Sequence, residues 1–435
     1  MNKLILFFIL LSISFEISAQ GNWKWTKVAP LPIASANNTI CKAKVNNNSL
    51  VYSFGGISNP LIPSSIHQRV FKYEVSNDEW TEVLDVPDTL AKIGSAASFV
   101  KNRIYLIGGK HVLNDGTEVS SQKVHVYNPF LDTFEIDRSE MPTPVYDHVQ
   151  NVWRDSLIFV ISGHSNTNTV PDVQIYNPSF DSWTTGTPLP NNAQYKSFGA
   201  SGYILGDTIY YFGGVTEDPT YQATNYFRKG VIDKDDPSQI SWSMIFSSPG
   251  NPLYKGVCSG HDKTLFWIGG ARKAYNYDAL EFYTNNPVTP NHRILEYTTN
   301  DNVHLNQFNT SFHVMDLKGI AKLGGGNWMI AGGIDSLQQA SDRAFILHNT
   351  SLSDIENATQ PPFFKVQESN DNYIVITENI GKIIIYDVTG RTLYKSTKQL
   401  ANLIIPKSRL SNGILLFVYE DEINLPVQIK KIKPH

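Results

Sequence analysis

Short apolar segments that end in two glycines recur along the chain, at intervals of about 50 to 60 residues. Arg-Ile-Tyr-Leu-Ile-Gly-Gly at residues 103–109 is a clear copy, and residues 157–163 are a degenerate one that ends in Ser-Gly. Four further copies end in the glycine pair, at residues 50–56, 208–214, 264–270 and 328–333. Their β-branched and aromatic residues predict strands. A repeat of this length predicts a propeller or a solenoid.

A second apolar segment follows several of these glycine pairs after a polar loop. It ends near an aromatic residue, and another aromatic residue follows across a turn. The clearest examples run from Val70–Tyr73 to Trp80, from Val124–Tyr127 to Phe134 and from Val173–Tyr176 to Trp183. This pattern resembles the kelch repeat. The resemblance implies an all-β fold in which residues 20–349 form a six-bladed β-propeller, similar to the sialic-acid mutarotase and galactose-oxidase-like kelch group.

The two ends of the repeat region are each incomplete. Residues Trp23–Val28 resemble the last strand of a blade, yet nothing before them could supply the other three strands. The last blade ends with Arg343–His348 and lacks a strand. We therefore expect the N-terminal strand to complete the last blade and close the ring. Residues 271–292 are interpreted as an inserted loop before Arg293–Tyr297, the third strand of the fifth blade, so no seventh blade is expected.

Residues 1–19 have a charged start, an apolar core too short to cross a bilayer and a small-residue end, which predicts a secretory signal peptide rather than a buried helix. No other stretch of the sequence is apolar for long enough to span a membrane, so we expect no transmembrane segment in the mature chain. The net charge of −4 disfavours a nucleic-acid partner. Cys41 and Cys258 lie in blades that are not neighbours, which predicts buried thiols rather than a disulfide.

The repeat disappears near residue 349. Residues 350–362 are polar, end in two prolines and are predicted to be a linker. Residues 363–435 alternate as short strands, which predicts a small C-terminal antiparallel β-sandwich.

The C-terminal segment resembles the sorting domain of the type IX secretion system of the Bacteroidetes. The resemblance rests on Ile385–Arg391, Leu410–Ile414 and Gln428–Lys433. It implies that residues 363–435 engage the outer-membrane secretion machinery, and that the protein is secreted or attached to the outer cell surface. An ordinary accessory β-sandwich is the alternative. Leu415 and Leu416 depart from the tyrosine usual in this family, and Pro361 and Pro362 lack the asparagine usual between its prolines.

Candidate binding residues lie where a propeller brings its inter-blade connections and the loops after the glycine pairs to one mouth of the channel. A lysine recurs at the start of the innermost strand, twice directly after a tyrosine. The candidates are Lys92, Tyr195, Lys196, Tyr254, Lys255, Arg272 and Lys318. They predict a cationic, tyrosine-rich mouth that suits an acidic glycan, and alanine at Lys255 and Lys318 should weaken glycan binding without lowering thermal stability. The alternative is that these lysines are ordinary solvated side chains, which recur only because the repeat itself recurs.

Tyr146 and His148 are the candidate catalytic residues if the protein is an enzyme, because tyrosine and histidine can share acid and base work near neutral pH. Two residues apart on a strand, they would point to one side. A histidine that only forms hydrogen bonds in the channel is the alternative. The sequence has no histidine spacing typical of a tight metal site, so we expect neither a metal nor a cofactor. The copper site of galactose oxidase includes a tyrosine cross-linked to a cysteine. Both cysteines of this chain are interpreted as core residues, which disfavours that chemistry.

Three functions remain open. The first is a binding module for an acidic glycan at the channel mouth. The second is a carbohydrate-active enzyme on acidic sugars, either similar to a mutarotase or epimerase or a polysaccharide lyase that uses Tyr146 and His148. The third is a protein-binding or adhesive surface propeller. The inserted loop at residues 271–292 favours the first two, since long loops in compact domains are often functional.

Overall fold

The computed structural model describes most of the chain up to residue 352 and parts of the remainder. The described ranges are 22–46, 48–216, 220–247, 252–299, 305–352, 364–369, 371–377, 381–387, 391–396, 402–410, 415–421 and 426–432. The predicted signal peptide, residues 1–19, and nearly all of the predicted linker lie outside them. The chain divides into two units, Met1–Ser353 and Asp354–His435, and each is described by itself.

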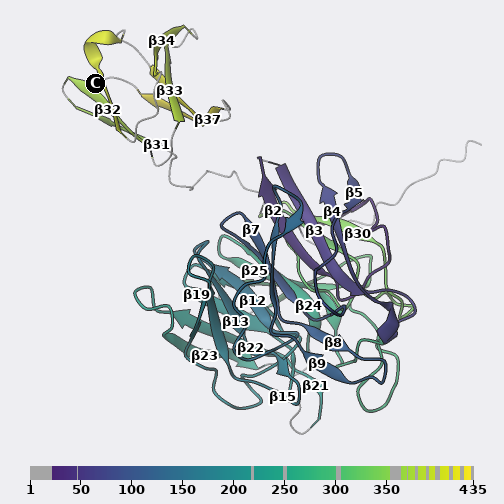
Figure 1. The fold of residues 1–435 in the computed structure, drawn as a ribbon. Coiled ribbons are helices and arrows are strands. Elements are labelled where there is room, and N and C mark those ends of the chain that lie inside the picture. Colours follow the sequence, from purple (N-terminus) through teal and green to yellow (C-terminus); the bar gives the residue numbers. More distant parts are fainter. Residues whose placement is uncertain are drawn as a thin grey trace, which may run out of the picture. The chain divides into compact units, whose positions relative to one another are not determined.

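Six four-stranded antiparallel sheets form the blades of the first unit (Figure 1). Blade 1 contains β2 (Thr39–Val45), β3 (Asn48–Ile57), β4 (Ile66–Glu74) and β5 (Glu79–Glu82); blade 2 contains β6 (Ala96–Val100), β7 (Arg103–Ile107), β10 (Val124–Asn128) and β11 (Thr133–Phe134); blade 3 contains β12 (Val149–Trp153), β13 (Leu157–Ile161), β16 (Val173–Asn177) and β17 (Ser182–Thr185). Blade 4 contains β18 (Ser201–Leu205), β19 (Thr208–Phe212), β22 (Tyr226–Ile232) and β23 (Ile240–Ser247); blade 5 contains β24 (Tyr254–His261), β25 (Thr264–Ala271), β26 (Arg293–Thr298) and β27 (Asn306–Asn309). Blade 6 contains β28 (Ala321–Gly324), β29 (Asn327–Ala331), β30 (Ala344–Asn349) and β1 (Trp23–Val28).

The N-terminal strand closes the ring, as the sequence predicts. β1 pairs antiparallel with β30 along its whole length, from Trp23 opposite Asn349 to Val28 opposite Ala344. A parallel bridge between Thr39 and Lys318 joins the innermost parts of blades 1 and 6. The sixth sheet therefore combines residues from both ends of the first unit, and β1 covers the outer edge of β30.

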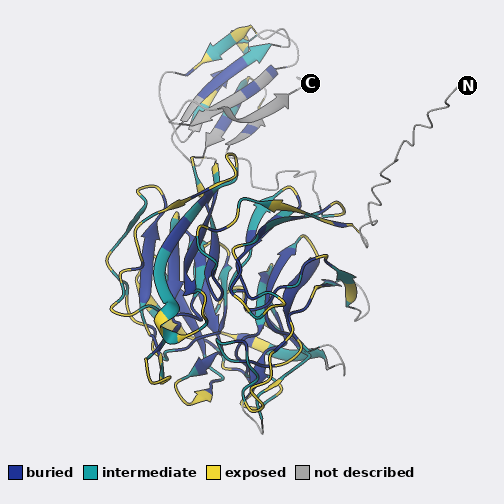
Figure 2. Ribbon diagram, turned by 90° about the vertical axis from the view of Figure 1, so that its right-hand side faces the viewer, coloured by how far each residue is buried: buried dark blue, intermediate teal, exposed yellow. Residues whose placement is uncertain are grey.

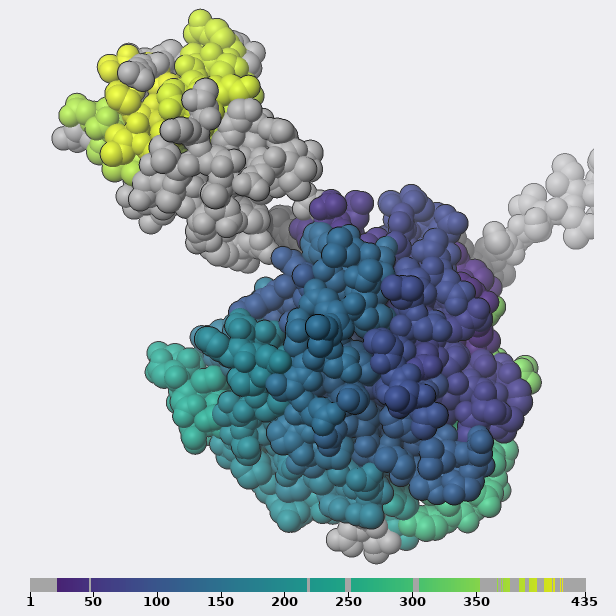
Figure 3. Space-filling view, in the orientation of Figure 1, coloured from purple at the N-terminus to yellow at the C-terminus, as the bar shows by residue number. Residues whose placement is uncertain are grey.

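Buried apolar side chains fill the space between neighbouring blades. Six clusters each combine residues of two adjacent blades, so every blade packs on both of its neighbours. Trp23 of β1, for example, lies 4.7 Å from the ring of Phe266 in blade 5 and 5.8 Å from that of Trp328 in blade 6. The buried strands of each blade are coloured dark blue in Figure 2. In Figure 3 the sequence colours pass in order from blade to blade across the visible face.

The glycine pairs allow each blade to contact the connection that enters the next blade. A Cβ on Gly213, where φ is +75°, would lie 2.2 Å from the carbonyl oxygen of Leu253. The N–H of the next residue, Gly214, donates to that same oxygen over 2.7 Å. No other amino acid fits such a position without moving the backbone, because the left-handed conformation and the close contact both exclude a side chain.

Short hairpins extend the loops after the glycine pairs in blades 2, 3 and 4. They are β8 (Lys110–Val112) with β9 (Glu118–Ser120), β14 (His164–Ser165) with β15 (Asn168–Thr169), and β20 (Val215–Thr216) with β21 (Gln222–Ala223). In blade 1 this loop carries the 3₁₀ turn η1 (Pro63–Ser65). Residues 271–292 form the corresponding loop of blade 5, stabilised by the bridges Tyr275 to Glu281 and Leu280 to Pro287. The interpretation of this segment as an inserted loop is confirmed.

Cys41 and Cys258 are free and buried, as expected for core thiols. They lie on the innermost strands of blades 1 and 5, which blade 6 separates. Within the described part of the chain, no helix has the length and apolar character needed to cross a membrane.

The second unit contains two antiparallel sheets. One has the order β31 (Phe364–Glu368), β32 (Asn372–Thr377) and β35 (Asn402–Pro406); the other has β34 (Thr392–Lys395), β33 (Gly381–Asp387), β36 (Leu415–Asp421) and β37 (Pro426–Ile432), with the 3₁₀ turn η2 (Lys407–Arg409) after β35. Tyr373 and Val375 of the first sheet share a buried cluster with Ile385 and Phe417 of the second. A complete β-sandwich over residues 363–435 stays a prediction, and residues 411–414 of the motif Leu410–Ile414 lie outside the described ranges.

Candidate functional site

One residue from each blade adopts a left-handed backbone conformation where the chain enters the innermost strand. These residues, which we call the axial ring, are Asn37, Gly94, Asp147, Gly199, Lys255 and Asp316, with φ between +50° and +73°. Hydrogen bonds connect them in order: Asp147 N–H donates to Gly94 O, Gly199 N–H to Asp147 O and Lys255 N–H to Gly199 O. Asn37 N–H donates to Asp316 O, and the side-chain oxygen of Asn37 accepts from Gly94 N–H. Leu317 N–H donates to Lys255 O and completes the circle.

Side chains of the axial ring form a buried, charge-balanced network. The Lys255 ammonium lies 2.9 Å from a carboxylate oxygen of Asp316 and 3.4 Å from one of Asp147. Lys318 pairs with the other oxygen of Asp147 at 3.1 Å, and Asn37 donates its amide to Asp316. Burial alone would lower the pKa of Lys255, but the two carboxylates reverse this and hold its pKa well above the usual value. Burial likewise opposes the charge of Asp147, yet the lysines keep its pKa low.

A cavity of about 260 Å³ lies on one side of the axial ring, and we call it the mouth cavity. Asp147 and Lys255 form part of its lining, together with aromatic side chains such as Phe198 and Tyr254. The hairpin β8–β9 and the loop 271–292 contribute to its wall. It lies where inter-blade connections and loops after the glycine pairs meet, and its lining is rich in aromatic residues.

Tyr146 donates a hydrogen bond to Glu118 within the mouth cavity, over 3.0 Å. Lys110 pairs with the same carboxylate at 2.5 Å, and its ammonium lies 4.4 Å from the centre of the Tyr146 ring. Burial first, and then the charge of Glu118, raise the pKa of Tyr146 far above its usual range. The phenol is thus held protonated, as a donor, and the charge of Lys110 is matched by a carboxylate.

A second hollow, of about 480 Å³, adjoins the mouth cavity, and we call it the rim groove. Tyr221 and Phe282 line both spaces. Tyr283, which is 61% exposed, stacks on Tyr221 with ring centres 5.8 Å apart. Arg272 is exposed in this groove, and no described carboxylate forms an ion pair with it. The neighbouring lysine, Lys273, pairs with Glu281.

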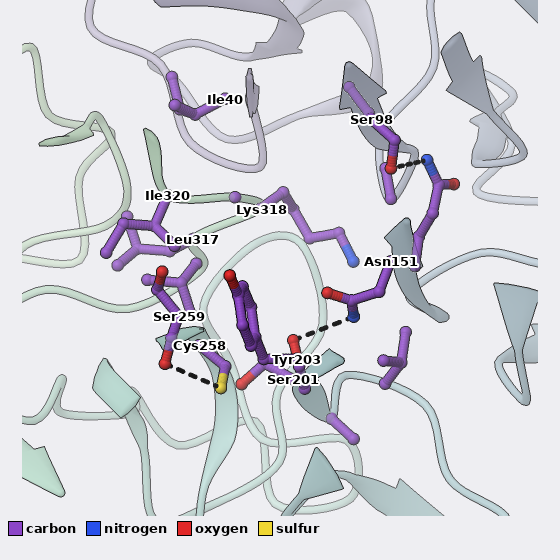
Figure 4. A pocket seen from close by; sticks show the side chains of 18 of the residues that line it. Ile40, Ser98, Asn151, Ser201, Tyr203, Cys258, Ser259, Leu317, Lys318 and Ile320 are labelled. Atoms are coloured by element: carbon purple, nitrogen blue, oxygen red, sulfur yellow. Dashed lines mark hydrogen bonds between the residues drawn. The ribbon is translucent and has the colours of Figure 1, made fainter. Parts of the chain in front are cut away.

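A third space, of about 320 Å³, lies between the innermost strands, and we call it the channel cavity. Figure 4 shows Lys318 and Asn151 pointing toward one another there, with the ring of Tyr203 beside them. His148 lines this cavity, whereas Tyr146 lines the mouth cavity. The prediction that Tyr146 and His148 point to one side is wrong. Both residues precede β12, and Asp147 between them has a left-handed conformation that breaks the alternation of a strand.

The recurring lysines do not converge at the mouth as predicted. Lys92 is buried between blades 1 and 2, where it pairs with Asp88 at 3.2 Å. Burial opposes the charge of Asp88, but the hydrogen bond that it accepts from His125 and the charge of Lys92 hold its pKa below the usual range. Lys318 lines the channel cavity and not the mouth cavity. Lys255 borders both, but its carboxylate partners are buried with it.

The remaining candidates lie apart from one another. Tyr195 and Lys196 are half-buried, and the Tyr195 ring packs against the apolar cluster between blades 3 and 4. Tyr254 is buried, with its ring 5.1 Å from that of Tyr275. The expectation that alanine at Lys255 would leave thermal stability unchanged does not fit this geometry, because it would leave Asp147 and Asp316 buried with less compensation.

Sequence reasoning missed the carboxylates of the site. Glu118 comes from the second strand of the hairpin β8–β9, which lies in a variable polar loop where the sequence gives no strand pattern. Asp147 and Asp316 occupy the position of Lys255 in their own blades, so an alignment of the repeats at this position would have found them. No cluster of His, Cys, Asp or Glu suited to a metal ion occurs among the described residues.

Comparisons with known proteins agree with this architecture. No family model matches the chain. Beta-scruin from Limulus polyphemus is 28% identical over 210 residues, which are 47% of this chain and 21% of that protein. Kelch-like protein 25 from Xenopus tropicalis is 26% identical over 175 residues, 38% of this chain and 27% of that protein. The first unit is a six-bladed kelch-repeat β-propeller.

A solved structure described as that of YjhT supports the same fold for the kelch propeller. It superposes with a TM-score of 0.58 and 16% identity, covering 73% of this chain and 96% of that one. At this level of identity the likeness concerns the fold alone. The matched segments span less than a third of the length of the curated relatives.

Proposed function

We propose that the kelch propeller is an exported binding module that recognises an acidic glycan at the mouth cavity and the rim groove. The observation that carries this proposal is the continuity of the two spaces. They share Tyr221 and Phe282, and together they offer aromatic faces, hydrogen-bonding groups and an exposed arginine. An extended saccharide can place one sugar in the mouth cavity and the next in the rim groove.

Aromatic side chains support a sugar ligand. Tyr221 and Tyr283 expose a stacked pair at the rim groove, a surface on which the apolar face of a pyranose can pack. In the mouth cavity, Glu118 and Lys110 offer an acceptor and a donor for sugar hydroxyls.

Arg272 supports a negative charge on the ligand. A guanidinium can bind a carboxylate or sulfate with two parallel hydrogen bonds, and no described acidic side chain already occupies it. Lys255 of the axial ring and the neighbouring Lys318 are bound to carboxylates. Selectivity for acidic over neutral glycans is therefore assigned to the rim groove.

A glycan screen of the mature chain, residues 20–435, tests the proposal. We expect retention of acidic polysaccharides and little retention of neutral ones. Arg272→Ala should reduce affinity for the acidic ligand by about tenfold, the value of one charge-assisted contact. Lys24→Ala, which removes an exposed cation from the outer strand β1, is the matched control and should have no effect. Equal binding by Arg272→Ala and the unchanged protein would refute the assignment.

A carbohydrate-active enzyme is the second candidate, favoured by the hydrogen bond between Tyr146 and Glu118 in the mouth cavity. Paired acidic and phenolic groups can transfer protons during sugar chemistry. Burial raises the pKa of Tyr146, which keeps the phenol protonated, so it can donate a hydrogen bond to a substrate but cannot act as a base. Following ultraviolet absorbance in the same screen detects unsaturated products of a lyase, and an anomer assay detects a mutarotase. If no glycan is retained or altered, a protein partner becomes the preferred ligand.

Export and surface attachment are proposed from residues 1–19 and 363–435. The first segment resembles a signal peptide, and the second resembles a sorting domain that engages outer-membrane secretion machinery. In a host with type IX secretion, full-length protein should reach the cell surface or the medium. A chain ending at residue 353 should stay in the periplasm; equal surface delivery of both would exclude the proposed role of the tail.

A further inference from the structure

The channel cavity and the mouth cavity differ in the charge of their linings. The mouth cavity has Lys110 and Lys255 facing Glu118 and Asp147, so positive and negative groups balance. Among the described residues that line the channel cavity there is no aspartate or glutamate, whereas three lysines contribute to its wall. Lys255 and Lys318 pair with Asp147 and Asp316, but neither aspartate lines the channel cavity, so among the described residues its wall contains ammonium groups and no carboxylate.

Three side chains present polar groups to the channel cavity. The Lys318 ammonium has three donors, and its ion pair with Asp147 occupies one direction. Asn151 uses its amide nitrogen to donate to Gly202 O over 3.1 Å, which leaves its second hydrogen available. The Tyr203 hydroxyl has no hydrogen-bond partner among the described residues, although the side chain lines the cavity.

Packing fixes the position of Tyr203. Its ring lies against Gly260, where an added Cβ would be only 2.8 Å from the ring edge. Burial raises the pKa of the phenol, so its proton stays in place as a donor. Lys322, further along the same wall, donates to Gly260 O. The site is thus held by contacts that do not depend on a ligand.

We infer that the channel cavity is a binding site for a small carboxylate or similar oxyanion, separate from the glycan site. Lys318 supplies the charge, and Tyr203 and Asn151 donate hydrogen bonds to the anion's oxygens. A volume of about 320 Å³ accommodates a compact organic acid but no polysaccharide. The inference does not rest on glycan binding, because the axial ring stands between the two spaces.

Isothermal titration calorimetry of residues 20–435 with malonate and with inorganic phosphate tests this inference. Glycerol, a neutral polyol, is the control ligand. We expect saturable binding of at least one anion and none of glycerol. Malonate binding would identify an organic acid as the preferred class, and phosphate binding an inorganic oxyanion.

Two variants locate the anion. Tyr203→Phe removes only the hydroxyl and should weaken binding about fivefold, with no loss of thermal stability. Lys318→Met should weaken binding by tenfold or more, in line with a charged contact of about 1.5 to 3 kcal/mol. Lys24→Ala, which removes an exposed cation from β1, is the control and should bind the anion unchanged. Arg272→Ala tests whether the anion binds in the rim groove instead. Absence of saturable binding, or binding that depends on Arg272 and not on Tyr203, would overturn the inference.

Discussion

Asp147 and Asp316 determine what the repeated lysines of this propeller can do. Each carboxylate is buried on the axis, and each lies within ion-pair distance of Lys255. Moving such charges out of water is costly, and the cost is offset only when every charge has a partner. The lysines are therefore part of the wall between two cavities, and a ligand meets their charge only where a further donor direction remains open, as at Lys318.

The buried imidazole of His148 should make the stability of the protein depend on pH. Burial, reinforced by the positive charge of Lys318, lowers its pKa from 6.5 to about 4. The unfolded chain therefore binds more protons than the folded chain between these values, so stability present above pH 6.5 is lost as the pH falls toward 4. The expected loss from this residue is about 3 kcal/mol. Urea unfolding at several pH values measures it.

The matched variant for this test is His148→Asn, which keeps a polar side chain beside Gln150 but cannot titrate in this range. Its stability should fall less steeply between pH 6.5 and 4 than that of the unchanged protein. Parallel stability curves for the two proteins would show that His148 is not the group responsible. His67, whose pKa is also lowered to about 4 by burial, contributes a remaining slope to both proteins.

At the residue scale, the sequence predicts which residue types lie near the axis better than it predicts which side chains they contact. Tyrosine and lysine at the start of an innermost strand are correctly placed near the axis at Tyr254 and Lys255. Their burial is not predicted, because the carboxylates that neutralise Lys255 come from other blades, Asp147 from blade 3 and Asp316 from blade 6. Tyr146 and His148 separate for a similar reason: the left-handed conformation of Asp147 cannot be read from a pattern of alternation.

Glycine pairs are the main determinants at the scale of the element. Each pair ends the second strand of a blade and brings it against the connection entering the next blade. At the ring closure, Gly333 N–H donates to Ser35 O over 2.8 Å, which connects blade 6 with blade 1. Because the contact requires both a left-handed backbone and the absence of a Cβ, the glycines recur where the other residues of the repeat drift.

Replacing Gly332 by alanine tests this role. Its φ is +80°, and an added Cβ would lie 2.3 Å from the carbonyl oxygen of Ser35. Gly116→Ala is the control, because Gly116 also has a positive φ of +85° but no atom within 4 Å of the added Cβ. The control should lose about 1 to 2 kcal/mol from backbone strain, and Gly332→Ala about 1 to 3 kcal/mol more from the clash. Equal losses in denaturant unfolding would mean that the close contact is unimportant.

The elements were largely predictable because strand pattern and glycine pairs recur in nearly every blade. Six blades, the third strand of blade 5 and the role of β1 follow from that repetition. The hairpins β8–β9, β14–β15 and β20–β21 were not predicted, since each occupies a variable polar loop with only two or three residues per strand. These loops carry Glu118 and Tyr221, so the least regular segments supply much of the mouth.

For the whole molecule, closure of the ring is the decisive event. In every other blade the four strands follow one another along the chain, with at most a short hairpin between them, and blade 6 alone needs a strand from the opposite end of the first unit. The pairing of β1 with β30 therefore connects residues more than 300 positions apart in the sequence. Contacts of this kind form late and cost loop entropy, yet they hold all six blade interfaces in one structure.

A chain that starts at Ala29, and so lacks β1, tests closure. It loses the pairing along β30 and the buried Trp23, whose removal alone corresponds to about 3 to 5 kcal/mol. Since domains are stable by only about 5 to 15 kcal/mol, we expect a large drop in melting temperature or failure to fold. The control chain, residues 20–353, keeps all six blades. Its propeller should melt at the same temperature as the propeller within the chain of residues 20–435. If the chain lacking β1 melted at the same temperature as this control, blade 6 would be stable with three strands and the ring would not depend on its closing strand.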